Sequence, residues 1–154
     1  MANQTIITYK PAYRQKFIAL NTEWLEKYFK VEPHDKRVFE NIEAQILIPG
    51  GEIFFCLCDG VVAGTVAMQK IDDNIFELAK MAVTEKYQGI GLSNLLMESC
   101  ISFAKTKNAS KIILLSNKSL KPAISLYVKF GFIETPMEPT DYSRANIQME
   151  LRLV

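Results

Sequence analysis

A glycine-containing segment in the middle of the chain has the residue types needed to bind a phosphate group. Its six residues are Gln88, Gly89, Ile90, Gly91, Leu92 and Ser93. Glycine lets the backbone approach a ligand closely, and the N–H groups at a helix N-terminus attract anions. A strand predicted to end near Val83 precedes the segment, and a predicted helix follows it. The segment therefore favours a pyrophosphate site, and the alternative is a tight strand-to-helix turn without a ligand.

Two common phosphate-binding fingerprints do not fit this segment. No Gly-Lys-Ser/Thr sequence follows the glycines, so the P-loop pattern is absent. The dinucleotide pattern G-x-G-x-x-G has Asn94 where its third glycine belongs. The next predicted strand ends in Ser116 and Asn117 instead of the acidic residue that binds a ribose. Nucleoside triphosphates and nicotinamide dinucleotides are both disfavoured as ligands.

The hydrophobic pattern before this segment predicts two helices followed by an antiparallel meander. A short strand is expected at residues 5–9. One helical face then carries Tyr13, Phe17, Leu20, Trp24 and Tyr28, and a second, shorter helix carries Val38, Ile42 and Ile46. Residues 30–35 are expected to separate the two helices. Strands are predicted at residues 52–58, 61–70 and 75–83, with Asp59-Gly60 as a hairpin turn.

The second half alternates helices and strands. Helical spacing runs from about residue 92 to 107, a strand follows at 111–115, and Gly131 ends another helix. Two closing strands are expected at residues 132–134 and 146–153. The order β-α-α-β-β-β-α-β-α-β-β predicts an α/β fold with a mixed, mostly antiparallel sheet and helices on both faces. A length of 154 residues is consistent with one domain over residues 1–154.

The composition excludes several classes of function. Eighteen basic and seventeen acidic residues give a net charge of +1, which disfavours nucleic acid or an anionic membrane as a partner. No apolar stretch reaches the ~18 residues of a membrane helix, and the N-terminus lacks signal-peptide character, so a cytoplasmic location is expected. Cys56, Cys58 and Cys100 are expected to be reduced core thiols. With His34 as the single histidine, no metal site is predicted.

The whole arrangement resembles the GCN5-related N-acetyltransferase (GNAT) family. The family's acetyl-CoA motif, Gln/Arg-x-x-Gly-x-Gly/Ala, aligns with Gln88 to Ser93. A second family element, Ala-x-x-x-Tyr-x-x-x-Gly-Phe, matches Ala123, Tyr127, Gly131 and Phe132. Both motifs stand in the family order, after a meander and before two closing strands. The resemblance covers nearly the full chain and implies the family's fold.

The sequence departs from the family pattern at two positions. Ser93 stands where the motif usually ends in glycine or alanine, and its hydroxyl is small enough to be tolerated beside a phosphate. Many members carry an asparagine near the cofactor, three residues before the alanine, where this chain has Leu120. We expect Asn117, one helical turn earlier, to take over that contact.

The resemblance implies a direct transfer of an acetyl group from acetyl-CoA to an amine, with coenzyme A as the second product and no metal. The N–H groups of residues 88–93 would bind the pyrophosphate. The pantetheine arm would lie along Met81, Ala82 and Val83 like an added strand. Tyr127 matches the family's general acid, which protonates the leaving thiolate. Its alternative interpretation is a core tyrosine on an apolar helix face.

The resemblance is less specific about which residue acts as the general base and which residues contact the acceptor. Glu77 lies on the strand that leads to the cofactor site and is the predicted base, with His34 and Glu32 as the other candidates. Tyr28, Glu32, His34 and Tyr142 are expected around the acceptor. Arg144 is a candidate to pair with a substrate carboxylate, and the alternative is that it is an ordinary surface arginine.

The expected function is N-acetylation of a small molecule or amino acid. Acetylation of a protein N-terminus or lysine uses the same chemistry and needs an open groove for the peptide. A non-catalytic acyl-CoA-binding module is the alternative of a different class. Many family members form homodimers, so the resemblance also implies one here as an expectation.

Overall fold

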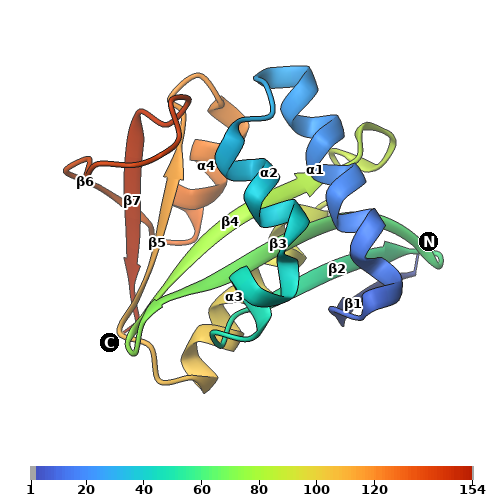
Figure 1. The fold of residues 1–154 in the computed structure, drawn as a ribbon, viewed down its shortest axis with the longest axis horizontal. Coiled ribbons are helices and arrows are strands. Elements are labelled where there is room, and N and C mark those ends of the chain that lie inside the picture. Colours follow the sequence, from blue (N-terminus) through green and yellow to red (C-terminus); the bar gives the residue numbers. More distant parts are fainter. Residues whose placement is uncertain (1–2, 154) are drawn as a thin grey trace.

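The computed structural model describes residues 3–153, which form a seven-stranded sheet in the order β1-β2-β3-β4-β5-β7-β6 (Figure 1). The strands are β1 (Gln4–Thr8), β2 (Glu52–Cys58), β3 (Val61–Asp72), β4 (Ile75–Val83), β5 (Lys111–Ser116), β6 (Ile133–Thr135) and β7 (Ile147–Arg152). All neighbouring strands are antiparallel except β4 and β5, which are parallel. The predicted mixed, mostly antiparallel sheet is therefore confirmed.

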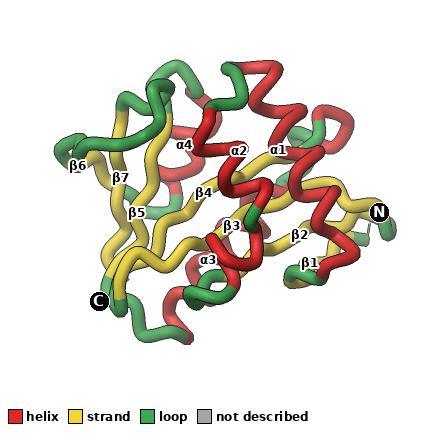
Figure 2. Tube along the Cα trace, viewed as in Figure 1, coloured by secondary structure: helices red, strands yellow, loops and turns green. Residues whose placement is uncertain are grey.

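Helices cover both faces of this sheet, as predicted (Figures 1 and 2). The helices are α1 (Arg14–Tyr28), α2 (Pro33–Glu40), α3 (Leu92–Thr106) and α4 (Lys121–Lys129). On one face α1 and α2 bury Phe17 and Val38 in a cluster that includes Phe55 of β2. On the other face α3 buries Leu96 in a cluster that includes Phe54 of β2. Adjacent strand residues thus serve opposite cores, as the period of two in a strand requires.

The chain between α1 and β2 differs from the sequence prediction. Residues 30–35 were expected to form a break, but α2 already begins at Pro33. Proline is tolerated at the first position of a helix because that N–H has no intrahelical partner. Glu32 and Asp35 form a capping box: the Glu32 side chain accepts from the backbone N–H of Asp35, and the Asp35 side chain accepts from the backbone N–H of Glu32. The helix then ends at Glu40, and a π-helical turn (Glu43–Leu47) continues to β2.

The two parallel strands at the centre of the sheet separate partway along their length. Their pairing runs only from Ile75–Lys111 to Leu78–Leu114. Beyond it β4 continues to Val83, while β5 ends at Ser116, and the two strands diverge (Figure 1). The sheet therefore opens beside the second half of β4.

The second half of β4 also contains a bulge. Lys80 and Met81 together lie opposite the single residue Val66 of β3. Before the bulge Leu78 is part of the α3-side core, and after it Met81 and Val83 pack against that same core. Because of the extra residue, even-numbered side chains face the α3-side core before the bulge and odd-numbered ones face it after the bulge.

The three cysteines are free and buried, as predicted, and all belong to the α3-side core. In the described part of the chain, no helix has the length and apolarity needed to cross a membrane.

The π-helical turn provides a test of the fold. Ile46 is fully buried, whereas Ile48, two residues later, is 80% exposed. We expect Ile46→Ala to lower the free energy of unfolding by about 2–5 kcal/mol, because a cavity replaces buried methyl groups. Ile48→Ala is the matched control and should change it by less than about 0.5 kcal/mol. Urea denaturation followed by circular dichroism measures both, and equal effects would contradict this packing.

Candidate functional site

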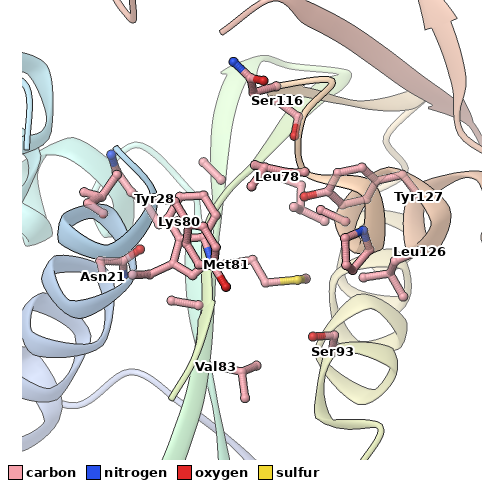
Figure 3. Close-up of a pocket in the computed structure, with 18 of the residues that line it drawn as sticks. Asn21, Tyr28, Leu78, Lys80, Met81, Val83, Ser93, Ser116, Leu126 and Tyr127 are labelled. Carbon is pink, nitrogen blue, oxygen red and sulfur yellow. The ribbon is translucent and has the colours of Figure 1, made fainter. Parts of the chain in front are cut away.

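A cavity of about 630 Å³ occupies the opening beside β4 (Figure 3). One wall is the second half of β4, from Glu77 to Val83. The start of α3, the end of β5 and α4 form the opposite side. A third wall comes from α1 and from the β6–β7 connection (residues 136–146), and we call it the acceptor-side wall because the sequence predicts acceptor contacts there. Segments far apart in the sequence therefore meet around one space.

The glycine segment lies at one end of this cavity, at the start of α3. Gly89 and Gly91 have φ angles of 81° and 89°, which are left-handed conformations that favour glycine. Gly91 is the N-cap of α3, with no side-chain cap and no acidic residue in the first turn. The first N–H groups of a helix have no intrahelical acceptor, so they are available to an anion. The side-chain amide of Gln88 donates to the Val83 carbonyl (3.0 Å) and holds the glycine segment against the end of β4.

Most residues predicted for the cofactor line this cavity. They are Met81, Ala82, Val83, Gln88, Gly89, Gly91, Leu92, Ser93, Asn117 and Tyr127. Ile90 is the exception, because it is not among the lining residues and its side chain is 48% exposed. Past Leu78 no strand of residues 3–153 pairs with the β5-facing edge of β4, so its peptide groups can pair with an extended ligand.

Asn117 lies on the cavity wall, but its polar atoms are already bonded. Its amide nitrogen donates to the Arg144 carbonyl (2.7 Å), and its side-chain oxygen accepts from the Ser119 N–H (2.9 Å). The side chain thus fastens the β6–β7 connection to the end of β5. Leu120 also lines the cavity.

Tyr127 projects from α4 into the cavity, with its hydroxyl directed toward β4 (Figure 3). Its side chain is buried, and its ring packs against Phe132 with 6.0 Å between centroids. Burial raises the pKa of Tyr127 to about 12, with a smaller contribution from Cys100, while Ser116 acts in the opposite direction. The phenol is therefore protonated at neutral pH and available as a proton donor.

Glu77 faces the cavity from β4, before the bulge. Burial raises the pKa of its carboxyl group, and nearby Lys80 acts against that rise. A raised carboxyl pKa makes a stronger base. Glu77 also lines a second cavity of about 400 Å³ that lies beside β5 and the β6–β7 connection. It therefore lies where the two spaces meet.

The structure places the four residues predicted for the acceptor in different surroundings. Tyr28 and Tyr142 line the main cavity. His34 lines the second cavity, where its ring contacts Tyr142 with 4.7 Å between centroids. Glu32 lines neither cavity, because its carboxylate accepts from the Ser143 N–H (2.9 Å) and from Arg144 (3.2 Å). The structure thus brings Tyr28 and Tyr142 together with Glu77 and Tyr127.

Sequence reasoning missed a buried cluster of charges beside the acceptor-side wall. Its members, which we call the Lys80 cluster, are Glu32, Asp35, Lys80, Tyr142 and Arg144. Lys80 forms an ion pair with Asp35, and its ammonium also donates to the Tyr142 hydroxyl (2.9 Å). Arg144 donates to both carboxylate oxygens of Asp35 (2.8 and 2.9 Å).

Arg144 corrects one of the sequence interpretations. A surface position was one alternative, but its side chain is only 17% exposed and is bonded within the cluster. The signal that could have revealed the cluster is Lys80 itself, since a lysine interrupts the apolar residues that alternate along β4.

The cluster is electrically balanced. Burial acts to raise the pKa of Asp35, but Arg144 and Lys80 outweigh it and lower the value to about 2. Burial lowers the pKa of Lys80, and Asp35 opposes that change. Two cations thus face two carboxylates, Glu32 and Asp35.

In residues 3–153 no group of three or more His, Cys, Asp or Glu side chains lies close enough together to hold a metal ion.

Known proteins share this fold and part of this sequence. A GNAT-family acetyltransferase from Staphylococcus aureus Mu50 superposes with a TM-score of 0.88 at 23% identity, over 99% of this chain and 100% of that one. An acetyl-CoA-bound GNAT acetyltransferase from Elizabethkingia anophelis gives 0.73 at 20% identity, over 98% and 99%. N-acetylaspartate synthetase of Danio rerio is 35% identical over 94 residues, which cover 60% of this chain and 33% of that protein. This chain therefore matches about a third of the length of that relative.

The family model gives the most direct assignment. The model of the acetyltransferase (GNAT) family matches residues 18–132, which include most of α1, the meander, the glycine segment and Tyr127. This match extends over well more than half of the sequence, and the superpositions agree with it. The chain belongs to the acetyltransferase (GNAT) family.

Proposed function

We propose that this protein transfers the acetyl group of acetyl-CoA to the primary amine of a small molecule or amino acid. The observation that carries the proposal is the opening beside β4. An uncapped helix N-terminus lies at one end of it, and Tyr127 and Glu77 line the same cavity. A phosphate-bearing ligand and two groups suited to proton transfer would therefore meet there.

The positions of α3 and β4 support one orientation of the cofactor. Its pyrophosphate would accept from the N–H groups of residues 88–93 at the start of α3. Its pantetheine arm would add to the free edge of β4 along Met81, Ala82 and Val83. This arrangement directs the thioester toward Tyr127 and Glu77.

The proposed reaction needs no covalent enzyme intermediate. The amine nitrogen attacks the thioester carbonyl carbon, and the new C–N bond forms as negative charge develops on the carbonyl oxygen. A backbone N–H of β4 would stabilise that charge. The C–S bond then breaks, Tyr127 protonates the departing thiolate, and Glu77 accepts the proton that the amine loses. The products are the acetylated amine and coenzyme A.

The anchored β6–β7 connection favours a small acceptor. The β6–β7 connection is fastened by Arg144 to α2 and by Asn117 to β5, so it forms a fixed wall on the acceptor side. A protein substrate would need an open groove there. Trp24, Tyr28 and Phe29 line the rest of this side, with 5.3 and 5.8 Å from the Trp24 ring to the other two. The relative named N-acetylaspartate synthetase further supports an amino-acid amine.

Cofactor binding is tested at the start of α3. Gly91→Ala and Gly91→Glu share the cost of a side chain at a positive φ, but only the glutamate adds a carboxylate beside the predicted pyrophosphate. We expect Gly91→Glu to bind acetyl-CoA at least tenfold more weakly than Gly91→Ala in isothermal titration calorimetry. Equal affinities for the two variants would refute a pyrophosphate site at this helix.

Catalysis is tested with a panel of amines. We expect mass spectrometry to detect acetylation of at least one amino acid or small amine by the wild-type protein. Tyr127→Phe should lower kcat about 10²-fold or more, with little change in acetyl-CoA affinity, because only the proton donor is lost. No acetylated product with intact acetyl-CoA binding would favour the non-catalytic module. Full activity of Tyr127→Phe would remove this residue from the mechanism.

The base is tested by pH dependence. Glu77 must be ionised to accept a proton, so kcat/KM should fall as pH drops through its pKa. Because that pKa is raised, the fall should begin above the usual range of a glutamate, about 4.3. Glu77→Gln should lose this acidic limb, whereas Glu138→Gln, which changes a carboxylate of the second cavity only, should keep it. An unaltered profile in Glu77→Gln would assign the base elsewhere.

A further inference from the structure

We propose that Lys80 is a positioning residue for acetyl transfer. Its side chain, held by Asp35 and Tyr142, fixes the bulge of β4 and thereby aims the backbone of Met81–Val83 at the acetyl group. This inference rests on the proposed function, and it assigns a role to a residue that does not itself react.

The backbone of Lys80 adopts a conformation that its side chain disfavours. Its φ angle is 59°, in the left-handed region, where the Cβ of a non-glycine residue comes too close to the backbone. The other non-glycine residues with positive φ in the described chain are Asp59 and Asn108, which are types that tolerate this region. A bulge with this geometry normally has glycine at that position. The surroundings of Lys80 must therefore hold it there.

The Lys80 cluster supplies that restraint. The side chains of Lys80 and Asp35 are 4% and 0% exposed, so water does not screen their ion pair. Asp35 in turn accepts two bonds from Arg144 and one from the Glu32 N–H (2.9 Å). The Lys80 ammonium is therefore connected to the start of α2 and to the β6–β7 connection. Both attachments fix its position relative to the cavity.

The bulge also has a reason in the sequence of β4. Phe76 and Leu78 belong to the α3-side core, and a regular strand would direct Lys80 into that core as well. A lone ammonium buried among apolar side chains is strongly disfavoured. The bulge instead turns Lys80 toward α2, and Met81 takes the place on the α3 side. The bulge in the β4 backbone and the ion pair of Lys80 with Asp35 therefore depend on each other.

The same contacts argue that Lys80 does not bind the acceptor. Lys80 and Arg144 line the cavity, and both are cations. Their charges are compensated by Asp35 and Glu32, and the Lys80 ammonium already donates to Asp35 and Tyr142. A substrate carboxylate would have to compete with two buried carboxylates of the protein. The cluster is therefore suited to holding the backbone in place.

The test compares two substitutions at position 80. Lys80→Gly permits the positive φ but removes the anchor, and Lys80→Met removes the charge while keeping most of the length. Lys70→Met makes the same exchange on the neighbouring strand β3, at a lysine paired with the exposed Asp73, and is the matched control. Circular dichroism and urea denaturation show whether each variant is folded.

Four measurements follow on the folded variants. Without ligand, amide NMR spectra should show shifted signals for residues 80–83 in both Lys80 variants and not in Lys70→Met. With acetyl-CoA labelled with ¹³C at the thioester carbonyl, the infrared band of the bound group should move toward its frequency in water. With an acceptor, kcat should fall at least tenfold, while the Kd of acetyl-CoA changes less than threefold.

The outcomes distinguish a failure of the positioning role from a failure of the proposed function. Lys80→Gly with wild-type NMR signals, infrared band and kcat would overturn the positioning role and leave the acetyltransferase proposal intact. A wild-type protein that fails to bind acetyl-CoA would overturn the proposed function, and the positioning role with it. A fall in acetyl-CoA affinity that matches the fall in kcat would show that Lys80 affects cofactor binding in general, which also overturns the inference.

Discussion

The parallel pairing of β4 with β5 is the constraint on which the site depends, because it stops at Leu78 and Leu114. A sheet that continued to pair would have filled the space now occupied by the cavity. The free edge of β4 faces an opening whose other wall is formed by α3 and α4. One strand therefore serves as a central element of the fold and as a surface on which a ligand can add its own hydrogen bonds.

The buried Lys80 cluster connects this strand to the acceptor side. Its members come from the start of α2, from β4 and from the β6–β7 connection. Breaking a buried ion pair leaves an uncompensated charge, so the three segments are held together strongly. Compensation also keeps the wall of the cavity close to neutral. The aromatic side chains of α1 and the carboxyl group of Glu77 then define what an acceptor contacts there.

Much of the fold was predictable because its signals are local. Periodicity identified α1, α3 and α4, and turn residues separated the strands of the meander, of which β2 and β4 have the predicted ends and β3 extends two residues further. The start of α2 was missed because a proline and several charged residues resemble a loop, although Glu32 and Asp35 also form a capping box. The acceptor side was less predictable. Glu32 and Arg144 were considered as substrate contacts, yet they bind each other across more than a hundred residues.

The sequence by itself determined the family, the glycine segment at the start of α3, and the helix that carries Tyr127. These depend on spacings within a single element, which the chain order preserves. Only the tertiary structure decided which polar residues face the cavity and which form ion pairs and hydrogen bonds with one another. Asp35, Lys80 and Arg144 meet through the packing of α2 and of the β6–β7 connection against β4. Burial and pairing of charges are properties of that packing, and the lysine among the apolar residues of β4 is only an indirect local sign of them.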